Sequence, residues 1–157
     1  MVDILLLFHL LLVNEKFGVY NIEVIEDIKD IKIYALKNEY IQVIINILNN
    51  AKDQLLKLEN KRRLIFVSVI ENSDNIILSI KDNANGVPLK IKDKIFEPYF
   101  TTKLDSKGTG IGLYMSYEMI TKHMDGALIL ENEKFTFEGI KYKGANFKII
   151  IPKKWSV

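Results

Sequence analysis

The sequence has no cysteine. A disulfide framework, a zinc site built from thiolates and a cysteine nucleophile are therefore all excluded, and the composition fits a reducing cytoplasmic environment. An excess of charge of one sign is also lacking, because 22 basic residues nearly balance 20 acidic ones and the formal net charge is +2. The lysines are spread along the chain, so nothing favours a nucleic acid or an anionic membrane as a partner.

Long hydrophobic runs are lacking as well. The most hydrophobic stretch, residues 4–13, has ten residues, whereas a membrane-spanning helix needs about 20. The pattern does not fit a signal peptide, because it has neither a basic start nor a small-residue cleavage site. We interpret residues 1–19 as an apolar segment that is either the end of an upstream helix or a helix that packs on the domain formed by residues 20–157.

The chain has the composition of an ordinary globular protein, 48% hydrophobic and 27% charged, and its 157 residues suit one domain. Short β-rich runs alternate with segments of helical spacing. The predicted strands are residues 20–26, 29–35, 64–70, 75–81, 127–131, 135–137 and 145–151, and the predicted helices are residues 38–58 and 113–123. This order predicts an α+β fold in which a helical layer covers a mixed sheet.

The longer predicted helix carries polar side chains on one face. At about 100° per residue, Asn46, Asn50, Asp53 and Lys57 fall opposite the apolar stripe of the helix. One interpretation is a solvated helix face. The other is a magnesium site, because amide oxygens are hard neutral ligands that suit Mg²⁺ together with phosphate oxygens and water. The helix alone does not decide between them.

A second candidate follows the strand at residues 75–81. Asp82 opens a loop in which Gly86 and Pro88 force a sharp turn, so the carboxylate lies at the edge of the sheet. A carboxylate there can accept a hydrogen bond from an exocyclic amine such as that of adenine. The same residues also make a generic turn, and this alternative stays open.

A third candidate is the glycine-rich segment of residues 107–113, which precedes the second helix. Glycines at alternate positions let the backbone approach an anion, and the amides of a helix start favour phosphate. A dinucleotide fingerprint is excluded because residues 101–107 are polar and loop-like rather than a strand. A P-loop is excluded because its sequence pattern does not occur.

In chain order these segments resemble the motifs of sensor histidine kinases over residues 20–152. The matching positions are Asn46, Asn50 and Ala51 (N-box), Asp82 to Gly86, Phe96, Pro98 and Phe100 (F-box), and Gly108 to Leu113. The resemblance implies the Bergerat fold, a two-layer sandwich with three helices on one face of a mostly antiparallel sheet. It also implies a nucleotide lid at residues 89–107.

The resemblance implies ATP and Mg²⁺ as cofactors and gives roles to particular residues. Asn50, helped by Asn46, is expected to hold the metal and act in catalysis, and Asp82 is expected to bind the adenine amine beside Gly86. The other nucleotide-binding residues implied are Lys103, Gly108, Thr109, Gly110, Gly112 and Leu113. Two positions depart from the family. Ala84 replaces a glycine, and Asp53 replaces a basic residue, so Lys57, Lys103 or Lys107 is expected to supply the charge.

Neither histidine has the setting of a phosphoacceptor. His9 lies among leucines, which predicts a packing residue, and His123 matches a structural histidine at the end of the second helix. We therefore expect the acceptor on an upstream dimerisation domain, and a response regulator as the next partner. This makes the chain a cytoplasmic kinase domain whose full-length protein can be anchored in the bacterial inner membrane.

Alternative functions stay open within the same fold. Related hydrolases use a glutamate base four residues before the magnesium asparagine. Here that position is Asn46, whose amide has no useful basicity, so transfer to a histidine is favoured over hydrolysis. Serine-directed anti-sigma kinases and nucleotide sensors without catalysis are the other candidates.

Overall fold

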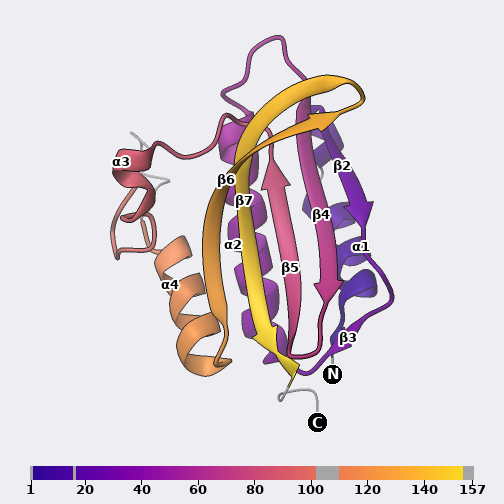
Figure 1. The fold of residues 1–157 in the computed structure, drawn as a ribbon, viewed down its shortest axis with the longest axis vertical. Helices are drawn as coiled ribbons and strands as arrows, with labels where there is room; N and C mark the ends of the chain where they lie inside the picture. The colour runs from indigo at the N-terminus through magenta and orange to yellow at the C-terminus, as the bar shows by residue number, and fades with distance from the viewer. Residues whose placement is uncertain (1, 16, 102–109, 154–157) are drawn as a thin grey trace.

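The computed structural model describes residues 2–15, 17–101 and 110–153 (Figure 1). A five-stranded sheet forms one layer, and its strands lie in the order β2-β4-β5-β7-β6. The pairing of β2 with β4 is parallel and the other three pairings are antiparallel, as the sequence predicted. The strands are β2 (Ile22–Asp27), β4 (Arg63–Glu71), β5 (Asn75–Asp82), β6 (Ala127–Phe137) and β7 (Ile140–Pro152).

The helices α1 (Ile4–Glu15) and α2 (Lys37–Leu55) lie behind the sheet as seen in Figure 1, and α4 (Gly112–Glu118) lies beside its β6 edge. The central helix, α2, is amphipathic because its apolar residues recur at three- and four-residue intervals. Its buried residues are Tyr40, Val43, Ile44, Ile47, Leu48, Ala51 and Leu55. They join the inward side chains of the strands in one hydrophobic core. Together these elements form the predicted two-layer sandwich.

The apolar N-terminal segment forms α1, which packs on the domain. Ile4, Leu7, Phe8 and Leu11 are buried at helical spacing and belong to the common core. The histidine of this helix does not pack there. The His9 side chain is 59% exposed and its Nε2 lies 3.7 Å from Glu26 of β2, so the prediction of a packing residue is wrong. The helix periodicity turns position 9 away from the buried face.

The structure departs from the predicted strands in two parts of the chain. Only β3 (Lys32–Ile33) forms within residues 29–35, and it pairs with β1 (Val2–Asp3) outside the main sheet. Residues 127–137 form the single strand β6, and β7 already begins at Ile140. The sequence pattern breaks at polar residues 132–134, but cross-strand pairing continues through them in unbroken register with β7.

The outer half of the β6–β7 hairpin curls over the end of the sheet, on the face that the helices leave open (Figure 1). Phe66 of β4 packs edge-on against Phe135 and Phe137, with ring centroids 5.3 and 5.0 Å apart. The neighbours of Phe66 in β4 belong to the main core, and alternation along a strand puts Phe66 on the opposite face.

In the described parts of the chain, no helix is long and apolar enough to cross a bilayer.

Candidate nucleotide-binding site

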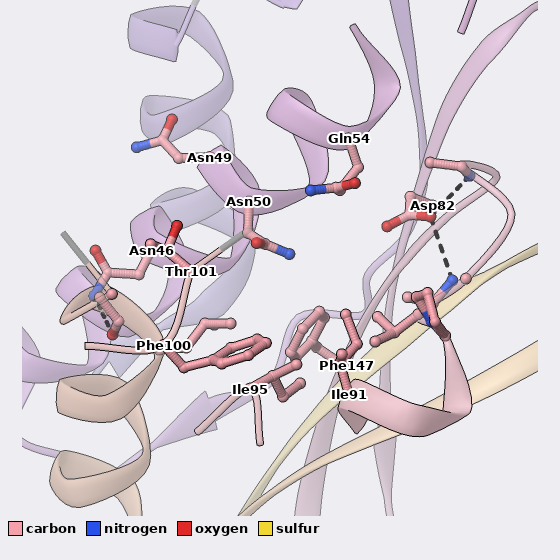
Figure 2. Close-up of a pocket in the computed structure, with 18 of the residues that line it drawn as sticks. Asn46, Asn49, Asn50, Gln54, Asp82, Ile91, Ile95, Phe100, Thr101 and Phe147 are labelled. Atoms are coloured by element: carbon pink, nitrogen blue, oxygen red, sulfur yellow. Dashed lines mark hydrogen bonds between the residues drawn. The ribbon is translucent and has the colours of Figure 1, made fainter. Parts of the chain in front are cut away.

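A cavity of about 440 Å³ lies between α2, the end of β5, the segment that follows β5, and the start of α4. Such a volume suits a small-molecule ligand. Side chains of α2 form a polar wall, apolar side chains form the opposite wall, and Asp82 lies at one end (Figure 2). With Ala145 and Phe147 of β7, which also line it, the cavity brings together four segments that are far apart in the sequence: residues 46–57, 82–101, 110–113 and 145–147.

The polar wall comes from one stripe of α2. Asn46, Asn50 and Lys57 line the cavity as the helical spacing predicted, and Asn49 and Gln54 line it too. Asp53 is not among the lining residues. Lys57 Nζ donates to Gln54 Oε1 over 3.3 Å. Lys57, one of the three lysines expected to supply the charge that Asp53 does not, therefore lies at this wall.

Asn46 ties α2 to α4. Its Nδ2 donates to the Gly112 carbonyl oxygen over 3.1 Å and to Ser116 Oγ over 3.0 Å. Its Oδ1 accepts a hydrogen bond from Gln42 Nε2 over 2.9 Å. Ser116 is fully buried and also donates to the Gly112 carbonyl oxygen over 2.8 Å. The amide of Asn46 is therefore occupied in positioning the glycine-rich turn.

The next two amides are not occupied in this way. Within the described residues, the side chain of Asn50 makes no hydrogen bond, and it points into the cavity (Figure 2). Asn49 Oδ1 is buried and has no hydrogen-bond partner among the described residues. An unpaired buried acceptor is costly. A wall with such amide groups therefore suits a ligand that donates hydrogen bonds or a metal that binds the amide oxygens. These residues fit Mg²⁺, which prefers oxygen ligands.

Asp82 is the most strongly perturbed acid of the described chain. Its side chain is 2% exposed, and burial raises the pKa of its carboxyl to about 6. The backbone N–H groups of Ala84 and Ala145 partly offset this rise by donating to Oδ1 over 2.9 and 3.3 Å. Both bonds fall on Oδ1, so Oδ2 is the oxygen that can accept from a ligand amine.

The loop after Asp82 has the turn that the sequence predicted. Asn85 and Gly86 adopt positive φ of 70° and 78°, whereas Ala84 does not, so an alanine is tolerated at position 84. A side chain at Gly86 would place its Cβ 2.7 Å from Asn132 Oδ1. Asn132 in turn holds the Val87 backbone at both its N–H and its carbonyl oxygen, each over 2.8 Å.

The apolar wall is made by Ile91, Ile95, Phe100 and Phe147 (Figure 2). The first three belong to the predicted lid, of which residues 89–101 are described and 102–107 are not. Its one-turn helix α3 (Leu89–Lys92) has no buried residue. Phe96 anchors the segment by stacking on Tyr117 of α4 at 5.4 Å and by meeting Phe147 edge-on at 6.3 Å.

The glycine-rich segment is described from Gly110 onward. Gly110 has φ of 72°, and a Cβ there would lie 2.3 Å from the Tyr99 carbonyl carbon, so only glycine fits this approach. Tyr99 donates its N–H to the Gly110 carbonyl oxygen over 2.9 Å. Gly110, Gly112 and Leu113 line the cavity. The predicted site residues Lys103, Gly108 and Thr109, like Lys107, lie outside the described residues.

The second histidine ties two helical elements together. His123 lies in η2 (Met119–His123), the π-helical turn that continues α4. Its Nδ1 is 3.0 Å from both carboxylate oxygens of Glu39 on α2. This contact agrees with a structural part for His123.

Comparisons with known proteins place the chain in a family. Residues 36–154 match the family model described as "Histidine kinase-, DNA gyrase B-, and HSP90-like ATPase". The chain is 36% identical to sporulation kinase E of Bacillus subtilis over 132 residues, which are 83% of this chain and 16% of that protein. It is 38% identical to the two-component sensor PprA of Pseudomonas aeruginosa over 95 residues, 59% of this chain and 10% of that protein.

Solved structures agree with this result. The catalytic domain of histidine kinase ThkA, at 26% identity, superposes with a TM-score of 0.78 and covers 96% of this chain and 95% of that one. The mycobacterial sensor histidine kinase MprB, at 20% identity, shares the fold with a TM-score of 0.76 over 96% of this chain and 95% of that one.

The fold and the cavity thus define a nucleotide-binding α+β sandwich. The chain belongs to the histidine kinase-, DNA gyrase B- and HSP90-like ATPase family, and within it to the ATP-binding catalytic domains of histidine kinases. The chain spans 10% to 24% of the length of the curated relatives compared with it.

Proposed function

We propose that this domain binds Mg-ATP in the cavity beside α2 and donates the γ-phosphoryl group to a histidine on a separate dimerisation domain. One observation carries the proposal: a buried carboxylate, Asp82, lies at one end of a cavity whose wall holds the unbonded amide of Asn50. An acceptor for the adenine amine and a neutral oxygen ligand for the metal are thus available to the same bound molecule.

One end of the cavity is proposed to bind the adenine, and the other is proposed to bind the metal and the phosphates. Asp82 Oδ2 accepts from the adenine amino group, and Phe147 and Ile91 contact the ring. Asn50 supplies an amide oxygen for Mg²⁺, and the close approach at Gly110 shapes the turn near the phosphates. Bound Mg²⁺ would neutralise charge on the phosphate oxygens. Lys103, Gly108 and Thr109 are proposed to complete the phosphate site.

Asn46 is proposed to position the start of α4 rather than to bind the metal. Its Oδ1 already accepts from Gln42 and its Nδ2 holds Gly112 and Ser116. An amide in this place has no useful basicity and cannot activate water, which favours transfer to an incoming nucleophile over hydrolysis. The nucleophile is proposed to come from the partner domain, which would then pass the phosphoryl group to a response regulator in the cytoplasm.

A labelling experiment tests the transfer. Incubated with radiolabelled ATP and Mg²⁺, the isolated chain should stay unlabelled, because His9 pairs with Glu26 and His123 with Glu39 and neither lies in the cavity. Addition of the native dimerisation domain should give acid-labile, base-stable label on that domain. Asn50→Asp should abolish this label, since it changes the metal shell where charge accumulates.

The matched control is Asn38→Asp, which makes the same chemical change at an exposed position near the start of the same helix. It should label the partner as the wild type does. Strong self-labelling on His9 or His123, or full activity of the Asn50→Asp variant, would contradict the mechanism. Rapid phosphate release without a partner would favour the hydrolase alternative.

A further inference from the structure

A second, basic groove lies on the other side of the loop of residues 82–86. Its volume is about 740 Å³, and five cations line it from two separate parts of the chain: Lys61 and Arg62 before β4, and Lys134, Lys141 and Lys143 on the β6–β7 hairpin. No acidic residue is among the described residues that line it. The hairpin that carries three of these cations curls over the end of the sheet (Figure 1).

Four of the five cations have no partner among the residues that the structure describes. Arg62 is held by Glu23 and Glu138 at 2.6 and 2.7 Å, but the four lysines make no ion pair or hydrogen bond with any described residue through their side chains. All four are exposed. The groove therefore has unneutralised positive charge that can attract an anion.

The strand register makes this arrangement costly without a ligand. Lys134 of β6 and Lys143 of β7 are directly opposite each other in the antiparallel ladder. Like charges at such a position are destabilising. The next pair on the same face is Thr136 with Lys141, which supplies no carboxylate, and Glu138 at the tip of the hairpin is bound to Arg62. An anion bound between Lys134 and Lys143 would remove the cost.

Lysines on a strand edge also discourage aggregation, but this does not account for Lys61 and Arg62, which reach the groove from a loop. A concave site that gathers charge from separate segments suits a compact ligand better than a flat protein surface. Lysine is a point-charge binder of phosphate. The chemistry of the groove therefore favours a small anion with several phosphate groups.

The groove is distinct from the nucleotide cavity although one loop borders both. Asp82, Ala84 and Gly86 line the cavity, whereas the alternate residues Asn83 and Asn85 line the groove. Asn83 is buried and fixed by Leu64 N–H and the Arg62 carbonyl oxygen, each over 2.9 Å. The two sites thus lie back to back across residues 82–86.

We propose that the groove beneath the β6–β7 hairpin is a second anion site, which binds a compact ligand bearing several phosphates between Lys61, Lys134 and Lys143. This site does not depend on the nucleotide cavity, and its ligand is held by charge rather than by an adenine acceptor. The nucleotide and the second anion can therefore be bound at the same time.

The test is a titration of the whole ¹⁵N-labelled chain with sodium tripolyphosphate, followed by NMR without Mg²⁺ and with ADP present at saturation. The amides of residues 83–85 and 134–143 should shift together. Lys134→Gln with Lys143→Gln should weaken binding about tenfold, since two charged contacts are lost. The control, Lys29→Gln with Lys32→Gln, removes the same charge from exposed positions outside both sites and should leave the affinity unchanged.

Several results would overturn the proposal. These are shifts confined to residues that line the nucleotide cavity, equal weakening by both double variants, or no binding at all. A hexaglutamate peptide serves as the second probe. If it binds the groove more tightly than tripolyphosphate, the ligand is an acidic protein segment and the proposed class is wrong. The Lys134→Gln, Lys143→Gln variant should unfold at a higher denaturant concentration than wild type, which shows that it is folded and checks the like-charge repulsion.

Discussion

At the scale of a single residue, the buried carboxylate of Asp82 lowers stability when it is charged, yet the charged form is the one available to a ligand. Burial at the end of the cavity where adenine is proposed to bind raises the pKa of the Asp82 carboxyl to about 6, from 3.8. The folded state therefore holds the proton more tightly than the unfolded state. The stability due to this group is fully present below the unfolded pKa, and it is lost as the pH rises through about 6. At neutral pH the charged form costs stability and is available to a ligand.

Asp82→Asn should for this reason stabilise the free domain at pH 7.5. The amide keeps an acceptor for the N–H groups of Ala84 and Ala145 but carries no buried charge. Its advantage over wild type should grow by about 2 kcal/mol between pH 4.5 and pH 7.5, given the size of the shift. Denaturant unfolding of both proteins at the two pH values measures this. An advantage that does not change with pH would contradict the burial of a charged carboxylate.

Some of the residues that line the cavity could be predicted from sequence motifs, and others could not. Asn46, Asn50 and Lys57 share a helix face, and all three line the cavity. Gln54 lies four residues after Asn50, so the same spacing argument could have found it. Asn132 could not be found in this way, because it acts from β6, 45 positions after Val87, and only the folded sheet brings the two together.

Among the elements, α4 depends on α2 for its place. The link is one amide, since Asn46 donates to both Gly112 and the buried Ser116. The start of α4 in turn carries glycines that line the cavity. Loss of this amide would therefore disturb the end of the cavity proposed to bind phosphate, as well as the packing of the two helices.

Asn46→Ala should lower the free energy of unfolding by about 1–2 kcal/mol, because both hydrogen bonds to α4 are lost together with the one from Gln42. Gln42→Ala removes only the exposed bond to Asn46, and should cost less than about 0.5 kcal/mol. Urea unfolding of the two variants compares them directly. Equal losses would mean that the tie to α4 contributes nothing.

The described part of the predicted lid, residues 89–101, is held by few contacts. Leu89 is 79% exposed and α3 has no buried residue, whereas Ile95 is buried and Phe96 stacks on Tyr117. Segments with few buried apolar contacts open at low free energy.

Without nucleotide, the amides of residues 91–94 should therefore exchange with solvent about a hundredfold faster than those in the middle of α2. Mg-ATP should slow them. Hydrogen exchange followed by mass spectrometry gives both rates, with the buried strand β5 as the internal reference. Exchange in residues 91–94 as slow as in α2 would rule out a lid that opens.

The limits of sequence reasoning differ between elements. The helix α2 was predicted well because its apolar spacing extends over five turns. The break predicted within residues 127–137 was wrong, because Glu131 and Glu133 pair with Lys148 and Lys81 on the sheet and so keep polar residues inside a continuous strand. Local polarity alone does not reveal such cross-strand partners.

For the whole molecule, one core joins the N-terminal helix, the central helix and the sheet. The fold was predictable because the order of strands and helices and four motifs in series agreed with each other. The attachment of α1 was left open, because its leucines cover every face and do not say which face packs. The finished sandwich places the cavity at the junction of α2, β5 and α4, where its walls come from separate motifs.

The most direct measurement is a calorimetric titration of ATP with Mg²⁺ into the wild-type chain and the Asp82→Asn variant at pH 7.5. The wild type should bind one ATP, and the variant should bind it about ten- to a hundredfold more weakly, because a charge-assisted hydrogen bond to the adenine amine is lost. Asp74→Asn, at an exposed turn, is the control and should bind like the wild type. Equal affinity of wild type and Asp82→Asn would contradict the assignment of this cavity to adenine.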